Sequence, residues 1–268
     1  MSKQQVFNKI ARDIKEVKIQ GARNIAKAAL YAYSLIPTKE SKRKLISLRE
    51  TEPMLEKVVN LAEDFPSSDI KKHFDYSQTE INKVILKLIK TDDIIFTHCH
   101  STNVINALIY AKRKGKKFQV YNTETRPLYQ GRKTAKQLKN ANIKVTMFVD
   151  SAIGIALSGK QGMRKANKIF LGSDALLREG IINKVGSGVI AQLAKINKTP
   201  VYIIADSWKF TKKRIPFEQR ELNEIWDKAP NHIKIKNPAF EFVDKKYIKK
   251  IVTEFGALSY DRFVKKVS

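Results

Sequence analysis

The hydrophobic pattern of the chain changes its period near residue 92, and this change constrains the fold more than any other feature. Before it, apolar residues recur every three or four positions, as they do in amphipathic helices. After it, short runs of β-branched and aromatic residues alternate with helical stretches. The runs occupy residues 94–96, 118–121, 145–149, 169–171 and 201–205. Because strands separated by helices pair in parallel through right-handed crossovers, the pattern predicts an α/β fold with a doubly wound, Rossmann-like sheet.

The same change of period suggests two domains. We expect a helical N-terminal domain over residues 1–90 and a Rossmann-like α/β domain with a ligand cleft over residues 91–268. Within the first, the Ser77–Glu80 spacing matches a capping box and predicts that a helix begins there. Near the end of the second, the pattern predicts an extended segment and then a small closing helix over residues 245–253.

The charge of the chain limits the classes of partner. Lys and Arg number 52 against 26 Asp and Glu, a formal net charge of +26. Such a charge favours phosphorylated ligands, RNA or an acidic protein. No RNA-binding signature with interleaved aromatic residues accompanies it, and a solvated lysine-rich surface explains it as well. We therefore expect at most nonspecific RNA binding through the basic surface.

Cysteine content and hydropathy limit the kinds of site and the cellular location that the sequence predicts. Cys99 is the one cysteine, which excludes an internal disulfide, and no Cys/His spacing is typical of a zinc site. The sequence thus predicts no metal and no cofactor. No apolar run approaches the roughly 20 residues that cross a bilayer, so no membrane partner is expected. A reducing, cytoplasmic location is the expectation.

Two reactive side chains follow two of the predicted strands. Cys99 comes just after residues 94–96, and Asp174 comes just after residues 169–171. In doubly wound sheets, ligands bind beyond the carboxyl ends of the strands. A thiol and a carboxyl group at that edge would be able to move protons on a small polar metabolite. The alternative is a buried structural cysteine and a helix-capping aspartate.

Two further segments carry polar groups suited to an anion. Arg126 and Gln130 follow the second predicted strand, and an arginine fork matches a phosphate or carboxylate. The alternative for Arg126 is a surface position in a turn. Asn183 and Lys184 precede Gly186, where glycine permits close backbone approach to a ligand.

Taken together and in order, these motifs resemble one superfamily. It contains the α, β and δ regulatory subunits of eukaryotic initiation factor 2B, their archaeal relatives, archaeal ribose-1,5-bisphosphate isomerase and methylthioribose-1-phosphate isomerase. The resemblance covers nearly the whole chain, and its compact length is similar to that of archaeal members. The motifs that carry it are Thr97-His98-Cys99-His100-Ser101, Glu124-Thr125-Arg126-Pro127 with Gln130-Gly131, Val149-Asp150-Ser151-Ala152, Gly172-Ser173-Asp174, Asn183-Lys184-Val185-Gly186, Ala205-Asp206-Ser207-Trp208-Lys209-Phe210 and Asn237-Pro238-Ala239-Phe240.

For the isomerases, the resemblance implies an aldose-to-ketose conversion at a sugar 1-phosphate. Cys99 and Asp174 would exchange protons with the sugar. Sugar hydroxyls or phosphate would be held by Gly21, Ala22, Arg126, Gln130, Asn183 and Lys184. The resemblance also implies a homodimer or higher oligomer that forms through the α/β domain.

Two departures from the isomerase pattern decide the interpretation. Gln20 and Glu52 stand where the resemblance implies phosphate-binding arginines, and Arg23 or Arg49 would have to compensate. We therefore favour an archaeal initiation-factor-2B-like regulatory subunit that retains a pocket for a phosphorylated sugar or nucleotide and has a translation-factor partner. The alternative is an active ribose-1,5-bisphosphate isomerase that uses the Cys99/Asp174 pair.

Overall fold

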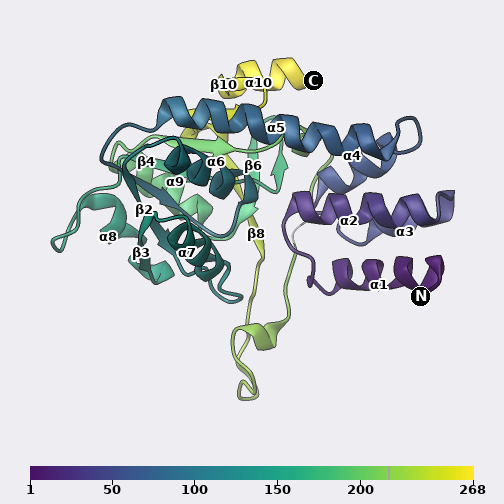
Figure 1. The fold of residues 1–268 in the computed structure, drawn as a ribbon. Coiled ribbons are helices and arrows are strands. Elements are labelled where there is room, and N and C mark those ends of the chain that lie inside the picture. The colour runs from purple at the N-terminus through teal and green to yellow at the C-terminus, as the bar shows by residue number, and fades with distance from the viewer. Residues whose placement is uncertain (217) are drawn as a thin grey trace.

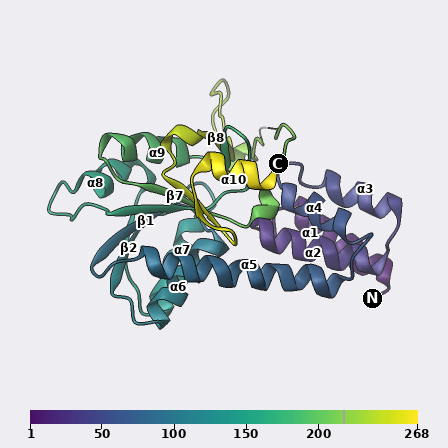
Figure 2. The same cartoon turned by 90° about the horizontal axis from the view of Figure 1, so that it is seen from above.

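The N-terminal part of the chain is helical. A computed structural model describes residues 1–216 and 218–268. The first four helices lie together at one end of the molecule (Figure 2). Their apolar stripes meet in one core around Phe7, Ile25 and Leu55. The helices are α1 (Lys3–Lys15), α2 (Ala22–Leu35), α3 (Lys39–Ser47), α4 (Pro53–Leu61) and α5 (Ser67–Leu88).

Helix α5 begins ten residues earlier than its predicted capping box. Pro66 precedes its first turn, and Ser77 lies inside the helix, so the prediction of a helix start at Ser77 was wrong. The Ser77 hydroxyl donates instead to the Glu254 carboxylate at 3.2 Å. Helix α5 packs on the N-terminal helices through Phe74 and on the sheet through Ile85. The domain boundary between residues 90 and 91 therefore stays a prediction, because one helix serves both parts (Figure 2).

A seven-stranded sheet forms the centre of the C-terminal part, which confirms the predicted fold class. Its order is β10-β9-β7-β4-β1-β2-β3, and all neighbours are parallel except β9 and β10. The strand order reverses between β1 and β4, which makes this pair the switch point where doubly wound sheets bind ligands. The strands are β1 (Asp93–Thr97), β2 (Phe118–Thr123), β3 (Lys144–Phe148), β4 (Lys168–Leu171), β7 (Val201–Ile204), β9 (Lys250–Thr253) and β10 (Gly256–Leu258).

Helices cover both faces of this sheet (Figure 1). Side chains alternate along β1, so Ile95 packs with one helical layer while Ile94 and Phe96 pack with the other. The first layer holds α5, α6 (Thr102–Arg113) and α7 (Gln130–Asn140). The second holds α8 (Ile153–Ser158), α9 (Ser187–Ile196) and α10 (Tyr260–Val267). Burial of both faces explains why the inner strands β1, β4 and β7 are mostly apolar.

A second, smaller sheet escaped the sequence analysis. It is antiparallel, with the order β5 (Ala175–Leu176), β6 (Gly180–Lys184) and β8 (Phe240–Asp244). The predicted closing helix over residues 245–253 was also wrong, because a 3-10 turn, η4 (Lys245–Tyr247), leads directly into β9. Short apolar runs do not distinguish strand from helix, and β-branched Ile251 and Val252 here join the sheet.

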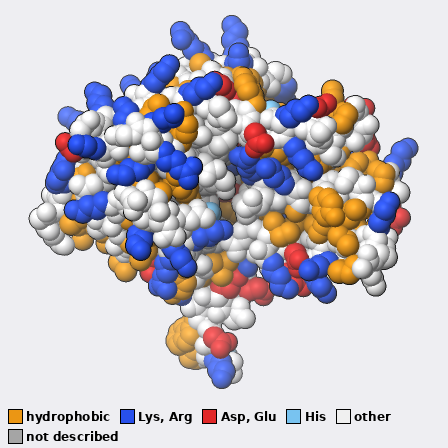
Figure 3. Space-filling model, in the orientation of Figure 1, with side chains coloured by type: hydrophobic (Ala, Val, Ile, Leu, Met, Phe, Trp, Pro, Cys, Tyr) orange, Lys and Arg blue, Asp and Glu red, His pale blue; other side chains and the backbone are white. Residues whose placement is uncertain are grey.

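A long excursion, residues 218–238, leaves the body of the molecule before β8 (Figure 1). We call it the arm. It contains the turn η3 (Leu222–Glu224), and Leu222, Ile225 and Trp226 are exposed on it. Elsewhere on the face of Figure 3, Lys and Arg side chains are scattered widely. None of the helices in the described part of the chain is long and apolar enough to cross a membrane.

Candidate functional site

Cys99 and Asp174 lie where the sheet topology predicts a ligand site. Cys99 follows β1 and Asp174 follows β4, and these are neighbouring strands on either side of the switch point. Both residues line the same two adjoining cavities, together with Gly21 and His100. The pair therefore stands at the junction of two lobes of one cleft.

The other lining residues differ between the lobes. We call them the Asn183 lobe and the Arg49 lobe. The Asn183 lobe adds Ala22, Arg23, Ser101, Asn183 and Lys209. The Arg49 lobe adds Gln20, Arg49, Glu52, Gln130, Lys184, Glu218 and Arg220.

The structure brings most of the predicted site residues together. Gly21, with φ of 83°, turns the chain into α2 and lines both lobes. Ala22 and Asn183 lie in one lobe, and Gln130 and Lys184 lie in the other.

Arg126 is the predicted site residue that does not reach the cleft. Its exposed side chain is not among the residues that line either lobe. The guanidinium lies over the ring of Tyr129, 5.1 Å from its centroid, and donates to the Ile225 carbonyl of the arm at 3.2 Å. Arg126 thus ties the arm to the loop after β2.

Hydrogen bonds fix the backbone of Cys99. Its φ of 63° lies in the left-handed region that a residue with a side chain adopts only at a cost. The Cys99 amide donates to the Thr125 hydroxyl at 3.0 Å, and the Thr134 hydroxyl donates to the Cys99 carbonyl at 2.7 Å. These contacts, from the loop after β2 and from α7, hold the thiol against the cleft.

Burial sets the protonation of the pair. It raises the pKa of the Cys99 thiol to about 12, with the Asp174 charge adding to the shift and Lys184 opposing it. Burial also raises the pKa of Asp174, against the pull of Lys209 and Arg49. The thiol is therefore protonated at neutral pH, and the Asp174 carboxyl group holds its proton to a higher pH than an ordinary aspartate does.

His100, which lines both lobes, was not predicted as a site residue although it belongs to the Thr97–Ser101 motif. Burial, followed by the charge of Lys133, lowers the pKa of His100 to about 4. Its Nδ1 lies 3.1 Å from the Thr134 hydroxyl. At neutral pH it therefore offers the cleft an uncharged imidazole.

The Arg49 lobe contains polar atoms that lack partners. Among the described residues, seven buried side-chain nitrogen or oxygen atoms have no hydrogen-bond partner, and five of them belong to residues of this lobe. They are Arg49 Nε, Arg49 Nη1, Glu52 Oε2, Gln130 Oε1 and Arg220 Nε. Buried polar groups rarely stay unpaired, so this concentration points to a polar ligand.

Both arginines in this set, Arg49 and Arg220, come from outside the predicted site. Arg49 precedes α4, and its Nη2 donates to Glu218 of the arm at 3.1 Å. Arg220, also of the arm, pairs with Glu224. The sequence analysis had named Arg49 as a cation that would have to compensate. It gave no signal for Arg220, because the arm is far from the other site residues in the sequence.

Glu52 faces the same lobe at the N-cap position of α4, with only 3% of its surface exposed. Burial and then the Asp174 charge raise the pKa of Glu52 to about 8, while Arg49 and Lys209 oppose the shift. At neutral pH the side chain is therefore mostly an uncharged acid. A neutral Glu52 removes much of the repulsion that a carboxylate would exert on a phosphate.

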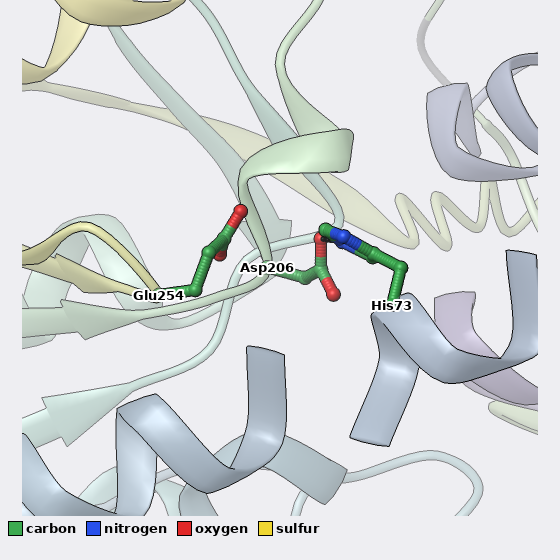
Figure 4. Close-up of side chains that lie close together, drawn as sticks. All are labelled: His73, Asp206 and Glu254. Atoms are coloured by element: carbon green, nitrogen blue, oxygen red, sulfur yellow. Dashed lines mark hydrogen bonds and ion pairs between the residues drawn. The ribbon is translucent and has the colours of Figure 1, made fainter. Parts of the chain in front are cut away.

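One group of described residues has donors spaced as for a metal ion: His73, Asp206 and Glu254, whose donor atoms lie within 4.8 Å of one another (Figure 4). Their donors already have protein partners. His73 Nε2 lies 3.0 Å from Asp206 Oδ1, and Glu254 accepts from Ser77 and Ser207. The cluster therefore serves as a network that joins α5 to the ends of β7 and β9.

Comparisons with known proteins agree on one family. A model described as the Initiation factor 2 subunit family matches residues 34–260. Ribose 1,5-bisphosphate isomerase of Methanocaldococcus jannaschii is 32% identical, with 96% of this chain and 93% of the relative aligned. A putative translation initiation factor eIF-2B subunit 2-like protein of Pyrococcus furiosus is 27% identical, with 93% and 95% aligned. The crystal structure of translation initiation factor eIF-2B from Pyrococcus horikoshii OT3 superposes with a TM-score of 0.83 at 24% identity, covering 96% of this chain and 98% of that chain, which shows a common fold.

Proposed function

Because the chain belongs to the initiation factor 2 subunit family, we propose that it is a sugar-phosphate isomerase that converts an aldose 1-phosphate into a ketose. The substrate we propose is ribose 1,5-bisphosphate, which the name of the Methanocaldococcus jannaschii relative carries. One observation carries the proposal: Cys99 and Asp174 share the junction of two lobes.

The reaction needs two proton carriers beside one sugar. One proton must reach the ring oxygen as its bond to C1 breaks, and another must leave C2, which gives an enol between C1 and C2. The second proton then returns to C1, and the C2 hydroxyl gives its proton to the carrier that had protonated the ring oxygen. A ketone forms, and both carriers regain their starting states.

The protonation of the pair supports one assignment of these roles. The Cys99 thiol, with a pKa of about 12, holds a proton that it would deliver to the ring oxygen. Asp174, a carboxylate of raised pKa, would take the proton from C2 and return it to C1. In this assignment the thiol starts as the acid and Asp174 starts as the carboxylate base, so the substrate meets one group of each kind.

The Arg49 lobe supplies cationic groups that would bind phosphate. The residues at positions 20 and 52 had left such groups in doubt. Arg49 and Arg220 present unpartnered N–H donors, and Lys184 adds a third cation. Guanidinium groups bind phosphate through charge-assisted hydrogen bonds, each worth about 1.5–3 kcal/mol. We therefore infer that Arg49 and Arg220 take the place of the arginines that are absent at positions 20 and 52.

This proposal reverses the preference of the sequence analysis for a regulatory subunit. That preference rested on Gln20 and Glu52, and the Arg49 lobe offers a physical answer to both. Relatives named as isomerases support the enzyme at least as well as the regulator. The Pyrococcus furiosus initiation-factor-like relative keeps the regulator as the second candidate.

An assay of ribose 1,5-bisphosphate conversion to ribulose 1,5-bisphosphate tests the proposal. We expect turnover by the unaltered protein and a loss of at least about a hundredfold in Cys99→Ser and in Asp174→Asn. Ribulose 1,5-bisphosphate should still raise the Tm of both variants, since neither change removes the arginines. Asp92→Asn makes the same chemical change at an exposed position before β1 and should leave turnover unaltered.

The result that would overturn the proposal is specific. An unaltered protein that shows no turnover above background, while ribulose 1,5-bisphosphate or a nucleotide raises its Tm, would be a regulator with a metabolite pocket. Turnover that survives in Cys99→Ser would exclude the thiol from the chemistry.

A further inference from the structure

Glu52 is the one acidic side chain of the Arg49 lobe with an unpartnered buried oxygen among the described residues. Its Oε2 has no hydrogen-bond partner, although the side chain is almost fully enclosed. Its Oε1 lies 3.9 Å from Arg49 Nη2, too far for a hydrogen bond. Glu52 lines the Arg49 lobe and also a neighbouring cavity that holds Glu50, Glu56, Lys213 and Arg214, and in neither does a protein group pair with its Oε2.

We propose that Glu52 binds the ligand's phosphate as a neutral carboxylic acid, by donating a hydrogen bond from the oxygen that the protein leaves unpartnered. This inference rests on the proposed function, because it takes a sugar phosphate as the ligand. It adds a binding residue at a position where the sequence alone indicated repulsion. Glu52 donates this hydrogen bond only while it is protonated, because the ionised carboxylate would repel the phosphate.

The charged groups around Glu52 act on its ionisation in opposite directions. Arg49 from its own loop and Lys209 from the 3-10 turn η2 (Ser207–Lys209) favour the carboxylate, whereas Asp174 from the loop after β4 and Glu218 from the arm oppose it. Lys184 and Arg220 also line the lobe. Two cations and two carboxylates thus act on Glu52 directly, and burial tips the balance toward the acid.

Ligand binding should then depend on pH in a window set by Glu52. With a pKa of about 8, the side chain is mostly neutral at pH 7 and almost fully ionised at pH 9.5. If only the neutral form binds, the apparent Kd rises roughly 30-fold between these values. The ligand contributes little to this change, because a phosphate monoester has its second pKa near 6 and is already mostly a dianion at pH 7.

Isothermal titration calorimetry with ribulose 1,5-bisphosphate between pH 7 and pH 9.5 tests the inference. The unaltered protein should lose affinity by roughly 30-fold. Glu52→Gln keeps an N–H donor without an ionisation, so its Kd should stay constant over the same range. Glu50→Gln, which removes an exposed carboxylate two positions away, should keep the pH dependence of the unaltered protein.

The outcomes separate this inference from the proposed function. A constant Kd for the unaltered protein, or an undiminished loss of affinity in Glu52→Gln, would overturn the role of Glu52 even if the protein is an isomerase. If the unaltered protein loses affinity between pH 7 and pH 9.5 and Glu52→Gln does not, the role of Glu52 is supported even if no turnover is found. Circular dichroism of Glu52→Gln at both pH values shows whether the variant is folded, and an unfolded variant would mean that Glu52 is structural and would overturn the inference.

Discussion

At the scale of single residues, Glu52 links the stability of the fold to pH. The folded chain holds a proton on Glu52 up to a pKa of about 8, whereas the ordinary value is 4.5. Between these values the unfolded chain has released the proton and the folded chain has not. The free energy of unfolding therefore falls as pH rises through this window.

Glu52→Gln should remove this dependence. We expect the variant to gain stability over the unaltered protein as pH rises from 5 to 8.5, by an amount on the order of a few kcal/mol. Chemical denaturation of both proteins at these two pH values measures the difference. A gain that is the same at both values would mean that Glu52 ionises normally in the folded state.

Two arginines make a second test at this scale. Arg49→Gln should weaken the binding of ribulose 1,5-bisphosphate by roughly ten- to a hundredfold, because it removes a charge-assisted contact in the lobe. Arg126→Gln should change the Kd by less than about threefold, since its side chain lies outside both lobes. The reverse order of effects in calorimetry would restore Arg126 to the site.

The sequence could place Cys99 and Asp174 in one cleft because a general rule governs their position. Residues that follow parallel strands meet at one edge of the sheet, whatever the side chains around them. No such rule predicts that Arg220 enters the cleft from the arm. Nor does one predict the contact between Arg49 and Glu218, because it joins segments that are far apart in the sequence. Burial of Glu52 depends on the same packing, so its neutral state could not be read from the sequence.

At the scale of elements, α7 approaches β2 so closely that only glycine fits at its start. A Cβ on Gly131 would lie 1.7 Å from the Thr123 carbonyl oxygen. This close approach positions Gln130, the residue before it, in the Arg49 lobe. The Gln130-Gly131 motif therefore combines a cleft residue with the glycine that lets its helix pack.

Gly131→Ala should destabilise the protein by roughly 1–3 kcal/mol, because the backbone must shift to admit the methyl group. Gly154→Ala is the matched control, since a Cβ at that position in α8 meets nothing within 4 Å. It should be neutral or stabilise by up to about 1 kcal/mol. Urea denaturation measures both, and equal effects would contradict the packing argument.

The predictions of helices and strands were correct where a long repeating pattern supported them, and they were wrong where the pattern was short. The five parallel strands with their intervening helices repeat one unit, so each supports the others. The strands β5 and β6 follow each other without a helix, β8 comes only after the arm, and β9 is predicted equally well as a helix. In α5, a local match to a capping box was overridden by packing that continues the helix across Ser77.

At the scale of the whole molecule, the helical N-terminal part contributes directly to the cleft of the sheet. Gly21 at the start of α2 and Arg49 and Glu52 before α4 meet Cys99 and Asp174 there. The His73–Asp206 contact and α5 fasten the same helices to the strand ends. The cleft is therefore complete only when both parts of the chain are packed together. The expected homodimer or higher oligomer stays a prediction.

The net charge of +26 leads to a prediction for the entire surface. A protein that neutralises several phosphates releases their counterions, so its affinity for nucleic acid falls steeply with salt. We expect single-stranded RNA of random sequence to bind at 50 mM salt and to lose roughly a thousandfold or more in affinity by 200 mM. Fluorescence anisotropy across this range measures the slope. Ribulose 1,5-bisphosphate should not displace the RNA, because the basic side chains are scattered over the surface (Figure 3), whereas the bisphosphate would bind within the two lobes. Binding that persists at 500 mM salt, or that the bisphosphate abolishes, would contradict this account and indicate a specific nucleic-acid site.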